Sequence, residues 1–501
     1  MMRRAQGLPA AVLAWSSMAT AFMACTGNRV VGGQDGSSDS GSTSMDGATT
    51  MAMDGTTGTD ETGSSSTELP PMDDCVEDGS CPRLDLLFVI DNSGTMGDEQ
   101  LALSNDVGAM VDELTHMVDV EGNPVELDVN IMVTTTDMGH PLCAPFQKPD
   151  YAPAEGAPIY TGCNARINRF TGLDPVSPVV IPEACTDNCP ADITPAGPFI
   201  HFDGTRSNVP GDDVEAALAC ILPQGVDGCG FESPLEAMLQ ALDPTQCWND
   251  PHQPACDADP QWADVEEGFL RPGGVLGVVF LTDELDCSVA GPEGYSYFTD
   301  IDNPLYWNVD PDFEEPRATS AICFNAGVTC QDADGDGVFE SCDSMDTGVL
   351  HPLDRYRERL LDLVGQGKTV VMMGGLGVPR VVAHNPNPVY EPIAGGLVDL
   401  QYRSWIDAPH PVGDIDPQDW DLGTRAEHKI FELGALGPGC ARVDGQGDLV
   451  GQALPPVRIR ELCQGLDTID DDGNARTRCC VESICSDELS PALRCLSGAV
   501  P

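Results

Sequence analysis

The sequence predicts an α/β fold with an open, doubly wound, mostly parallel β-sheet and large disulfide-rich insertions. Three observations support this prediction. Short apolar runs, typical of strands buried on both faces, alternate with segments of helical periodicity. Polar loops stand directly after these runs. Many of the 21 cysteines fall in irregular segments between them. Strands that alternate with helices indicate a sheet covered on both sides.

The expected elements follow one another along the chain. The apolar run at 84–90 predicts a first strand, and a helix follows it after the acidic pair Asp98 and Glu99. Apolar and mostly polar residues alternate at 125–133, which predicts a second strand with one exposed face, as at a sheet edge. The later elements are strands at 274–281 and 369–373 and helices at 212–222, 233–242, 352–364 and 490–496.

Three segments interrupt this pattern and are interpreted as insertions in one domain spanning 75–499. They cover about 139–210, 243–268 and 287–350, and the first is rich in Pro, Gly and Cys without a sustained period. The two larger insertions make the predicted domain longer than a minimal sheet of this kind.

The amino-terminal residues 1–25 have the pattern of an export signal, because two arginines precede an apolar run and Cys25 follows it. Residues 22–25 resemble a bacterial lipobox, in which the cysteine is lipidated; ordinary signal cleavage nearby is the alternative. Residues 26–74 are rich in Ser, Thr, Gly and Asp, which predicts a disordered linker. We therefore expect an exported protein, lipid-anchored in the bacterial cell envelope and facing the periplasm or the exterior.

The cysteines agree with export. Setting Cys25 aside leaves 20 of the 21, an even number that favours disulfides in an oxidising compartment over free thiols or a metal cluster. Connectivity does not follow from the sequence, although Cys75 with Cys81 and Cys330 with Cys342 are plausible local pairs.

The charge excludes two classes of partner. The chain carries 81 acidic residues against 24 Lys and Arg, a formal net charge of -57. Such a surface repels nucleic acid and anionic lipid. Contact with a membrane is therefore expected only through the amino-terminal lipid.

Three polar loops follow predicted strands or precede a predicted helix, where ligands bind in a doubly wound sheet. The first holds Asp91, Ser93 and Thr95, the second offers Ser233 or Glu232, and the third offers Asp283. Oxygen-only ligands suit a hard cation, here Mg²⁺ or Mn²⁺. Each loop alone has ordinary turn composition, so the prediction depends on the three together.

The order of these loops resembles the von Willebrand factor A family and its metal-ion-dependent adhesion site. That family has Asp-x-Ser-x-Ser after the first strand, which Asp91, Ser93 and Thr95 match with one hydroxyl exchanged. Ser233 stands where the family has Thr, and Asp283 stands in the family's Thr-Asp-Gly, with Glu in place of the Gly. The resemblance covers scattered elements from about 84 to 373.

In that family the cation's open position takes an acidic residue of a ligand. The resemblance therefore implies a non-enzymatic adhesion or assembly protein on the cell surface, whose partner is a protein or matrix ligand that offers a carboxylate.

A different function class also fits the first loop. The residues around Asp91 resemble the first motif of haloacid dehalogenase-like phosphotransferases, in which this aspartate is the nucleophile. Asp283 and Asp286 would then hold Mg²⁺. Against this alternative, the required Lys has only Lys148 as a candidate, and the second catalytic Asp is replaced by Ser93.

A second cation site is predicted at 332–343. Carboxylates at loop positions 1, 3, 5, 9 and 12 and a Gly at position 6 follow the spacing of a Ca²⁺-binding EF-hand loop. Cysteines flank the loop in place of helices, so it resembles the Ca²⁺ loops of thrombospondin type 3 repeats. The expected ligands are Asp332, Asp334, Asp336, Val338, Glu340 and Asp343. We expect this Ca²⁺ to order the surrounding insertion.

Overall fold

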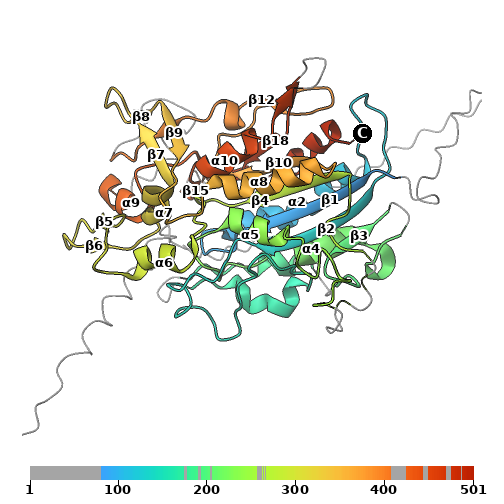
Figure 1. Ribbon diagram of the computed structural model, residues 1–501, viewed down its shortest axis with the longest axis horizontal. Helices are drawn as coiled ribbons and strands as arrows, with labels where there is room; N and C mark the ends of the chain where they lie inside the picture. The colour runs from blue at the N-terminus through green and yellow to red at the C-terminus, as the bar shows by residue number, and fades with distance from the viewer. Residues whose placement is uncertain are drawn as a thin grey trace, which may run out of the picture.

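The structure is a computed structural model, which describes residues 81–500 except 174–177, 190–192, 204–205, 257–261, 263–264, 266, 408–424, 444–448, 470–474 and 487. The predicted signal at 1–25, the linker at 26–74, Cys25 and Cys75 lie outside the described residues, as does part of the insertion at 243–268. The described chain is an α/β fold around a six-stranded sheet (Figure 1).

The central sheet has the strand order β18-β10-β4-β1-β2-β3. Five strands are parallel, and only the edge strand β3 is antiparallel to its neighbour. Ile90 at the end of β1 lies opposite Thr135 of β2 and Leu281 of β4, so the carboxyl ends of these strands are level. The bounds are β1 (Arg83–Ile90), β2 (Asp128–Thr135), β3 (Ile200–Phe202), β4 (Val275–Leu281), β10 (Thr369–Leu376) and β18 (Cys479–Ser483).

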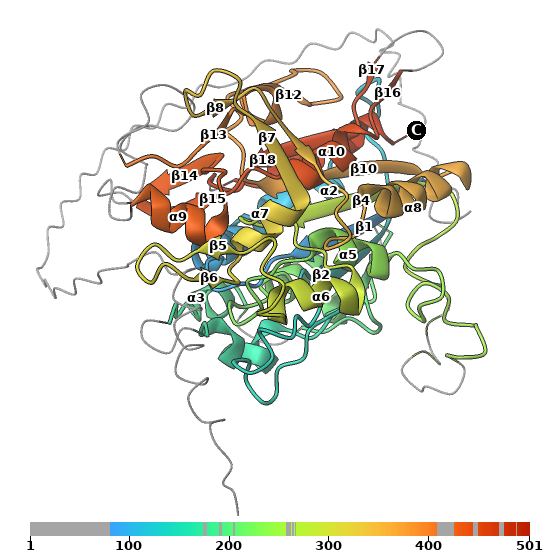
Figure 2. The same ribbon diagram turned by 60° about the vertical axis from the view of Figure 1, so that its left-hand side comes forward.

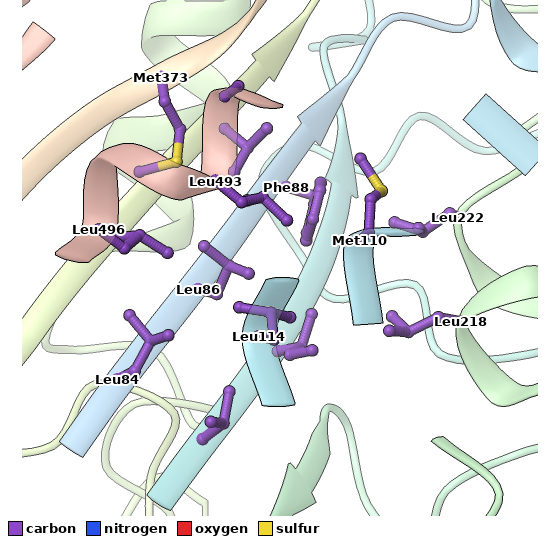
Figure 3. Close-up of a cluster of buried hydrophobic side chains, with 14 of the residues drawn as sticks. Leu84, Leu86, Phe88, Met110, Leu114, Leu218, Leu222, Met373, Leu493 and Leu496 are labelled. Atoms are coloured by element: carbon purple, nitrogen blue, oxygen red, sulfur yellow. The ribbon is translucent and has the colours of Figure 1, made fainter. Parts of the chain in front are cut away.

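Helices cover both faces of the sheet and divide the core into two layers. Leu86 and Phe88 of β1 pack on one side with Leu114 and Leu493 (Figure 3). Alternate residues of the same strand point the other way, because successive side chains in a strand face opposite directions. The first layer contains α2 (Gly97–Thr115), α4 (Val214–Ile221) and the 3₁₀ helix η7 (Ser490–Gly498), and the second contains α5 (Pro234–Ala241), α8 (Leu353–Gly365) and α10 (Val457–Gln464).

A buried ion-pair network lies at the amino ends of the strands. Asp85 of β1 accepts hydrogen bonds from Arg271 Nε at 2.8 Å and from Lys368 Nζ at 2.6 Å, and all three side chains are almost fully buried. Buried charges must be paired in this way, since the cost of removing them from water is otherwise large.

Two expectations about the sheet are wrong. β2 is an interior strand between β1 and β3, and every residue of it after Asp128 is buried. The edge strand β3 comes from the segment at 139–210 that the sequence assigned to an insertion. The other edge strand, β18, lies in the Cys-rich end of the chain, where no strand was expected.

The insertions pack as small elements, and the figures show α6, α7, β5 and β6 together beyond one end of the central strands (Figures 1 and 2). The bounds in the first insertion are η3 (Cys163–Phe170), α3 (Glu183–Thr186) and η4 (Pro210–Asp212). Those in the insertion at 287–350 are α6 (Gly291–Thr299), β5 (Asn308–Val309), β6 (Pro316–Arg317), α7 (Ala321–Gly327), β7 (Val328–Gln331), β8 (Val338–Phe339) and β9 (Ser341–Ser344).

The carboxyl-terminal third adds small hairpins around the main sheet. Its elements are β11 (Ala383–His384), β12 (Pro392–Ala394), η6 (Gly396–Val398), β13 (Tyr402–Arg403), α9 (Ala426–Leu433), β14 (Cys440–Val443), β15 (Leu449–Ala453), β16 (Thr468–Ile469) and β17 (Ala475–Arg476).

Disulfides link these segments to the sheet. The predicted pair Cys330–Cys342 is confirmed. Cys81 is also disulfide-bonded, but its predicted partner Cys75 lies outside the described residues. Such dense cross-linking indicates an oxidising, extracytosolic environment. Within the described part of the chain, no helix is long and apolar enough to cross a membrane. The other bonds are Cys143–Cys229, Cys163–Cys185, Cys189–Cys220, Cys247–Cys256, Cys287–Cys323, Cys440–Cys485, Cys463–Cys479 and Cys480–Cys495.

Candidate metal centre

The candidate site lies at the point where the strand order reverses. From β1 the chain continues to β2 and β3 on one side and later returns to β4 on the other. The crevice at the carboxyl ends of two such strands is the usual ligand site of a doubly wound sheet. Asp91 directly follows β1, and Asp283 stands two residues after β4. The fold therefore brings the first and third predicted loops together.

Asp91 is fully buried and held from both sides. Its Oδ1 accepts a 2.8 Å hydrogen bond from the backbone N–H of Ser93, which closes a tight turn. Its Oδ2 accepts a 2.6 Å bond from the hydroxyl of Thr282. Gln100 donates from its amide to the Asp91 carbonyl at 2.8 Å. These contacts fix the direction of the Asp91 carboxyl group.

Hydroxyl oxygens lie beside this carboxyl group. The side-chain oxygens of Ser93 and Thr95 are 3.1 Å apart, and Thr95 is also hydrogen-bonded to Asp283. Among the residues that the structure describes, no donor reaches Oδ1 of Asp283, although this carboxyl group is buried. Four of the five predicted adhesion-site residues are thus neighbours.

Ser233 is placed differently. Its hydroxyl donates a 2.9 Å hydrogen bond to the carbonyl of Cys287, while its backbone N–H donates to the Thr136 carbonyl at 3.0 Å. These bonds position the loop before α5. The side chain next to Ser233, that of Glu232, is the one that contacts Asp91.

Glu232 is fully buried and only partly satisfied. One oxygen, Oε2, accepts a hydrogen bond from the hydroxyl of Thr136. The other, Oε1, has no hydrogen-bond partner in the described part of the chain. The sequence offered Glu232 and Ser233 as alternatives for this loop, and the signal for Glu232 was its acidic side chain just before a helix start.

The site concentrates negative charge in the interior. Burial raises the pKa of Asp91, and it raises the pKa values of Glu232 and Asp283 well above normal, with a further increase from the Asp91 charge. Burial and the Asp91 charge also raise the pKa of Glu284 well above normal. Burial also raises the pKa of Glu99, at the start of α2, to about 7.

Buried carboxyl groups of this kind require a compensating charge or a proton. The oxygen donors at this end of the sheet are carboxylates and hydroxyls, which suit Mg²⁺, Mn²⁺ or Ca²⁺ rather than a thiolate-seeking metal. Among the described residues, no three carboxylates at this site each place an oxygen within 4.8 Å of the other two, so the three acidic groups are neighbours without being gathered around one point. Oε1 of Glu232 and Oδ1 of Asp283 are buried without a hydrogen-bond donor in the described part of the chain. Buried polar atoms normally have a partner, and a cation would be a suitable one for these two oxygens.

The residues that a phosphotransferase would need have other partners. Lys148 is ion-paired with Asp227 at 3.3 Å and donates to the Thr171 carbonyl at 2.8 Å. Asp286 accepts a 2.8 Å hydrogen bond from the buried guanidinium of Arg458. Neither side chain therefore serves the Asp91 carboxyl group.

The predicted Ca²⁺ loop is a tight turn at the surface, closed by the Cys330–Cys342 disulfide. The carboxylates of Asp332, Asp334 and Asp336 each place one oxygen within 4.8 Å of the others. Gly337 has φ +84°, as the predicted sharp turn requires.

The other three predicted ligands of this loop have different surroundings. Glu340 accepts from the backbone N–H of Ala333 at 3.0 and 3.1 Å. Asp343 lies on β9 and accepts from the Ser341 hydroxyl at 3.1 Å. Val338 opens β8, and its N–H donates to Asp336 at 2.8 Å. The structure thus brings three of the five predicted carboxylates together.

Cysteine-based metal binding is not supported in the described residues. The two groups that contain cysteines, one with His140 and one with Cys185, consist of cysteines already in disulfides. No protein-family model, curated protein or solved structure matches this chain.

Proposed function

We propose that this chain is an exported von Willebrand factor A-like protein that binds a partner through a divalent cation at the end of β1. The observation that carries the proposal is the pair of buried, unpaired carboxylate oxygens of Glu232 and Asp283 beside Asp91. A divalent cation bound at Asp91 would draw these oxygens toward it and offset the charge that burial makes unfavourable.

Each ligand has a distinct role in this proposal. Asp91 and Asp283 supply carboxylates from neighbouring strand ends, and Ser93 and Thr95 supply hydroxyl oxygens from the turn. Glu232 supplies the oxygen that the resemblance assigns to a hydroxyl at Ser233. The proposed cation is Mg²⁺ or Mn²⁺.

The partner would offer a carboxylate, as ligands of the resembling family do. Thr95 keeps more solvent exposure than the buried carboxyl groups around it, so a partner would approach the cation from the side of Thr95. Lipidation of Cys25 and the linker at 26–74 would display the domain away from the membrane.

The Ca²⁺ loop would act separately. Three converging carboxylates at the tip of the β7–β9 hairpin support Ca²⁺ binding there. Its role would be to order this surface insertion, since the loop is exposed and is anchored by the hydrogen bond from the Ser404 N–H to the Gly337 carbonyl at 2.8 Å.

Titration calorimetry of the mature chain with Mg²⁺ and Mn²⁺ tests the proposal. Asp91→Asn and Glu232→Gln should each weaken binding at least about tenfold, the effect of losing one charged ligand. Asp119→Asn removes an exposed carboxylate elsewhere and is the matched control. Equal affinities in all four proteins would refute the site.

A pull-down in Mg²⁺ against EDTA then tests partner binding, with Asp91→Ala as the negative control. Hydrolysis of a generic phosphate ester that disappears in Asp91→Ala would instead establish the phosphohydrolase.

A further inference from the structure

A second surface feature lies in the insertion at 287–350. Four large apolar side chains are exposed within residues 301–313: Ile301 at 78%, Leu305 at 68%, Val309 at 57% and Phe313 at 60%. Single exposed apolar residues are common, but a concentration of them on one segment marks an interaction surface. We call residues 300–317 the apolar lobe.

The lobe is rigid at its tip. Oδ1 of Asp310 accepts from the backbone N–H groups of Asp312 at 2.9 Å and Phe313 at 3.2 Å. The other carboxylate oxygen pairs with Arg317 at 3.2 Å, and the Arg317 guanidinium lies 4.7 Å from the centre of the Phe313 ring. The buried Asp310 thus holds the turn between β5 and β6 in the conformation that exposes Phe313.

The lobe is also fixed at its base. Asn325 of α7 donates to the Tyr306 carbonyl at 2.8 Å, and Asn308 donates to the Ile430 carbonyl of α9 at 2.6 Å. Trp307 donates from its indole to the Tyr297 carbonyl. The apolar side chains are therefore held in water by a structured backbone. A surface ordered in advance loses little conformational entropy when a partner binds.

The charge within the lobe is mostly negative, although Asp312 lies 3.8 Å from the guanidinium of Arg425 and 3.8 Å from the imidazole of His428. Exposed acidic residues alternate with the apolar ones, whereas Arg317 is the one basic residue in the lobe and already pairs with Asp310. The exposed acidic residues are Asp300, Asp302, Asp312, Glu314 and Glu315.

We propose that the apolar lobe binds a protein segment that combines apolar side chains with Lys or Arg. Apolar contacts with Leu305 and Phe313 would supply affinity, and the acidic rim would select basic partners. An anionic membrane is repelled by the same rim. A second copy of this chain, with a net charge of -57, lacks the complementary charge.

This proposal does not depend on the cation site. The segment just beyond the lobe nevertheless contacts the loop that carries Glu232. The hydroxyl of Ser320 donates a 3.3 Å hydrogen bond to the carbonyl of Gly230, which stands two residues before Glu232. All binding measurements are therefore made in both EDTA and Mg²⁺, and the lobe should bind equally in each.

The probe is a fluorescent amphipathic peptide of Lys and Leu, titrated with the full mature chain and followed by anisotropy. Two control peptides separate the contributions, one with Glu in place of Lys and one with Ser in place of Leu. The Lys/Leu peptide should bind best. Leu305→Ser with Phe313→Ser should weaken it about tenfold, the effect of removing apolar contact area.

Val382→Ser with Val398→Ser is the matched control. These side chains are 77% and 63% exposed, comparable to Leu305 and Phe313, but they lie outside the lobe. Circular dichroism confirms that each variant is folded. Equal binding of the Glu/Leu or Lys/Ser peptide would overturn the proposal. So would retained affinity in the lobe variant, preferential binding to phosphatidylglycerol vesicles, or a dimer in sedimentation that the lobe variant abolishes.

Discussion

The carboxyl groups of Asp91 and Glu232 lie within hydrogen-bonding reach of each other in the protein interior. Two carboxylates in contact repel each other unless a proton or a cation lies between them.

Glu232→Gln should have opposite effects with and without metal. In EDTA the raised pKa of Glu232 means that folding at neutral pH costs either the uptake of a proton or a buried charge, and Gln removes that cost while its amide can still donate to Asp91, so the free energy of unfolding should rise by about 1 kcal/mol. Mg²⁺ at 100 times its dissociation constant should stabilise the wild type by about 2.7 kcal/mol and the variant much less. Thermal and urea unfolding measure the stability in EDTA and the stabilisation by Mg²⁺. A variant less stable than the wild type in EDTA would contradict the placement of this pair. Ser233→Ala, which loses only the bond to Cys287, is the control.

Asp336→Asn should abolish Ca²⁺ binding at the surface loop, because it removes one of three converging carboxylates. Calorimetry with Ca²⁺ detects the loss, and Asp346→Asn, an exposed neighbour outside the loop, should leave the affinity unchanged. In an Asp91→Asn background the Ca²⁺ heat from this loop should persist. If it disappears there, the two cation sites are not separate.

Arg271→Met should lower the free energy of unfolding by about 3–5 kcal/mol, because it leaves the buried Asp85 with one fewer cationic partner. Arg357→Met breaks an exposed pair with Asp354 and should cost less than about 1 kcal/mol. Denaturant titration under non-reducing conditions compares them. Similar losses in the two variants would show that burial adds nothing to the Asp85 network.

His140 should make stability depend on pH. Burial lowers the pKa of His140 to about 3, where its ring packs against Phe231 and Phe298. The unfolded chain binds a proton near pH 6.5 and the folded chain does not, so acid favours unfolding between those two values. The contribution is present above pH 6.5 and is lost as the pH falls.

From pH 7 to pH 5 this loss amounts to about 2 kcal/mol. His140→Phe keeps an aromatic ring in the cluster and should remove that part of the pH dependence, measured as urea unfolding in EDTA. Parallel stability–pH curves for the two proteins would show that the pKa of His140 is the same in the folded and unfolded states.

The interior strands could be predicted because burial on both faces produces continuous apolar runs, as in β1, β4 and β10. β3 and β18 could not, since one has only three residues and the other begins with two cysteines and ends in Glu and Ser. β2 was wrongly predicted to be an edge strand, because a polar residue such as Asn130 in the alternating pattern indicates an exposed position. In the structure Asn130 is buried, with hydrogen bonds to the Phe269 carbonyl at 3.1 Å and to His201 at 2.9 Å.

The candidate site was predictable to the level of its loops. Residues that directly follow parallel strands meet at one sheet edge, whatever the details of packing. The choice between Glu232 and Ser233 was not predictable, because adjacent residues in an irregular loop point in directions set by the local backbone. Here the bonds of Ser233 to Thr136 and Cys287 determine that direction.

The edge strand β3 has a consequence for how this protein can associate. Directly after β3 the chain turns back, and His201 exchanges hydrogen bonds with Asn208, from the Asn208 backbone N–H at 3.0 Å and to its side-chain oxygen at 2.9 Å. Phe202 is bridged in the same way to Ser207. The returning segment thereby hydrogen-bonds to the outer edge of β3. A foreign strand, or the sheet of a neighbouring molecule, finds these backbone groups already hydrogen-bonded, which protects the protein from strand-to-strand aggregation at this edge.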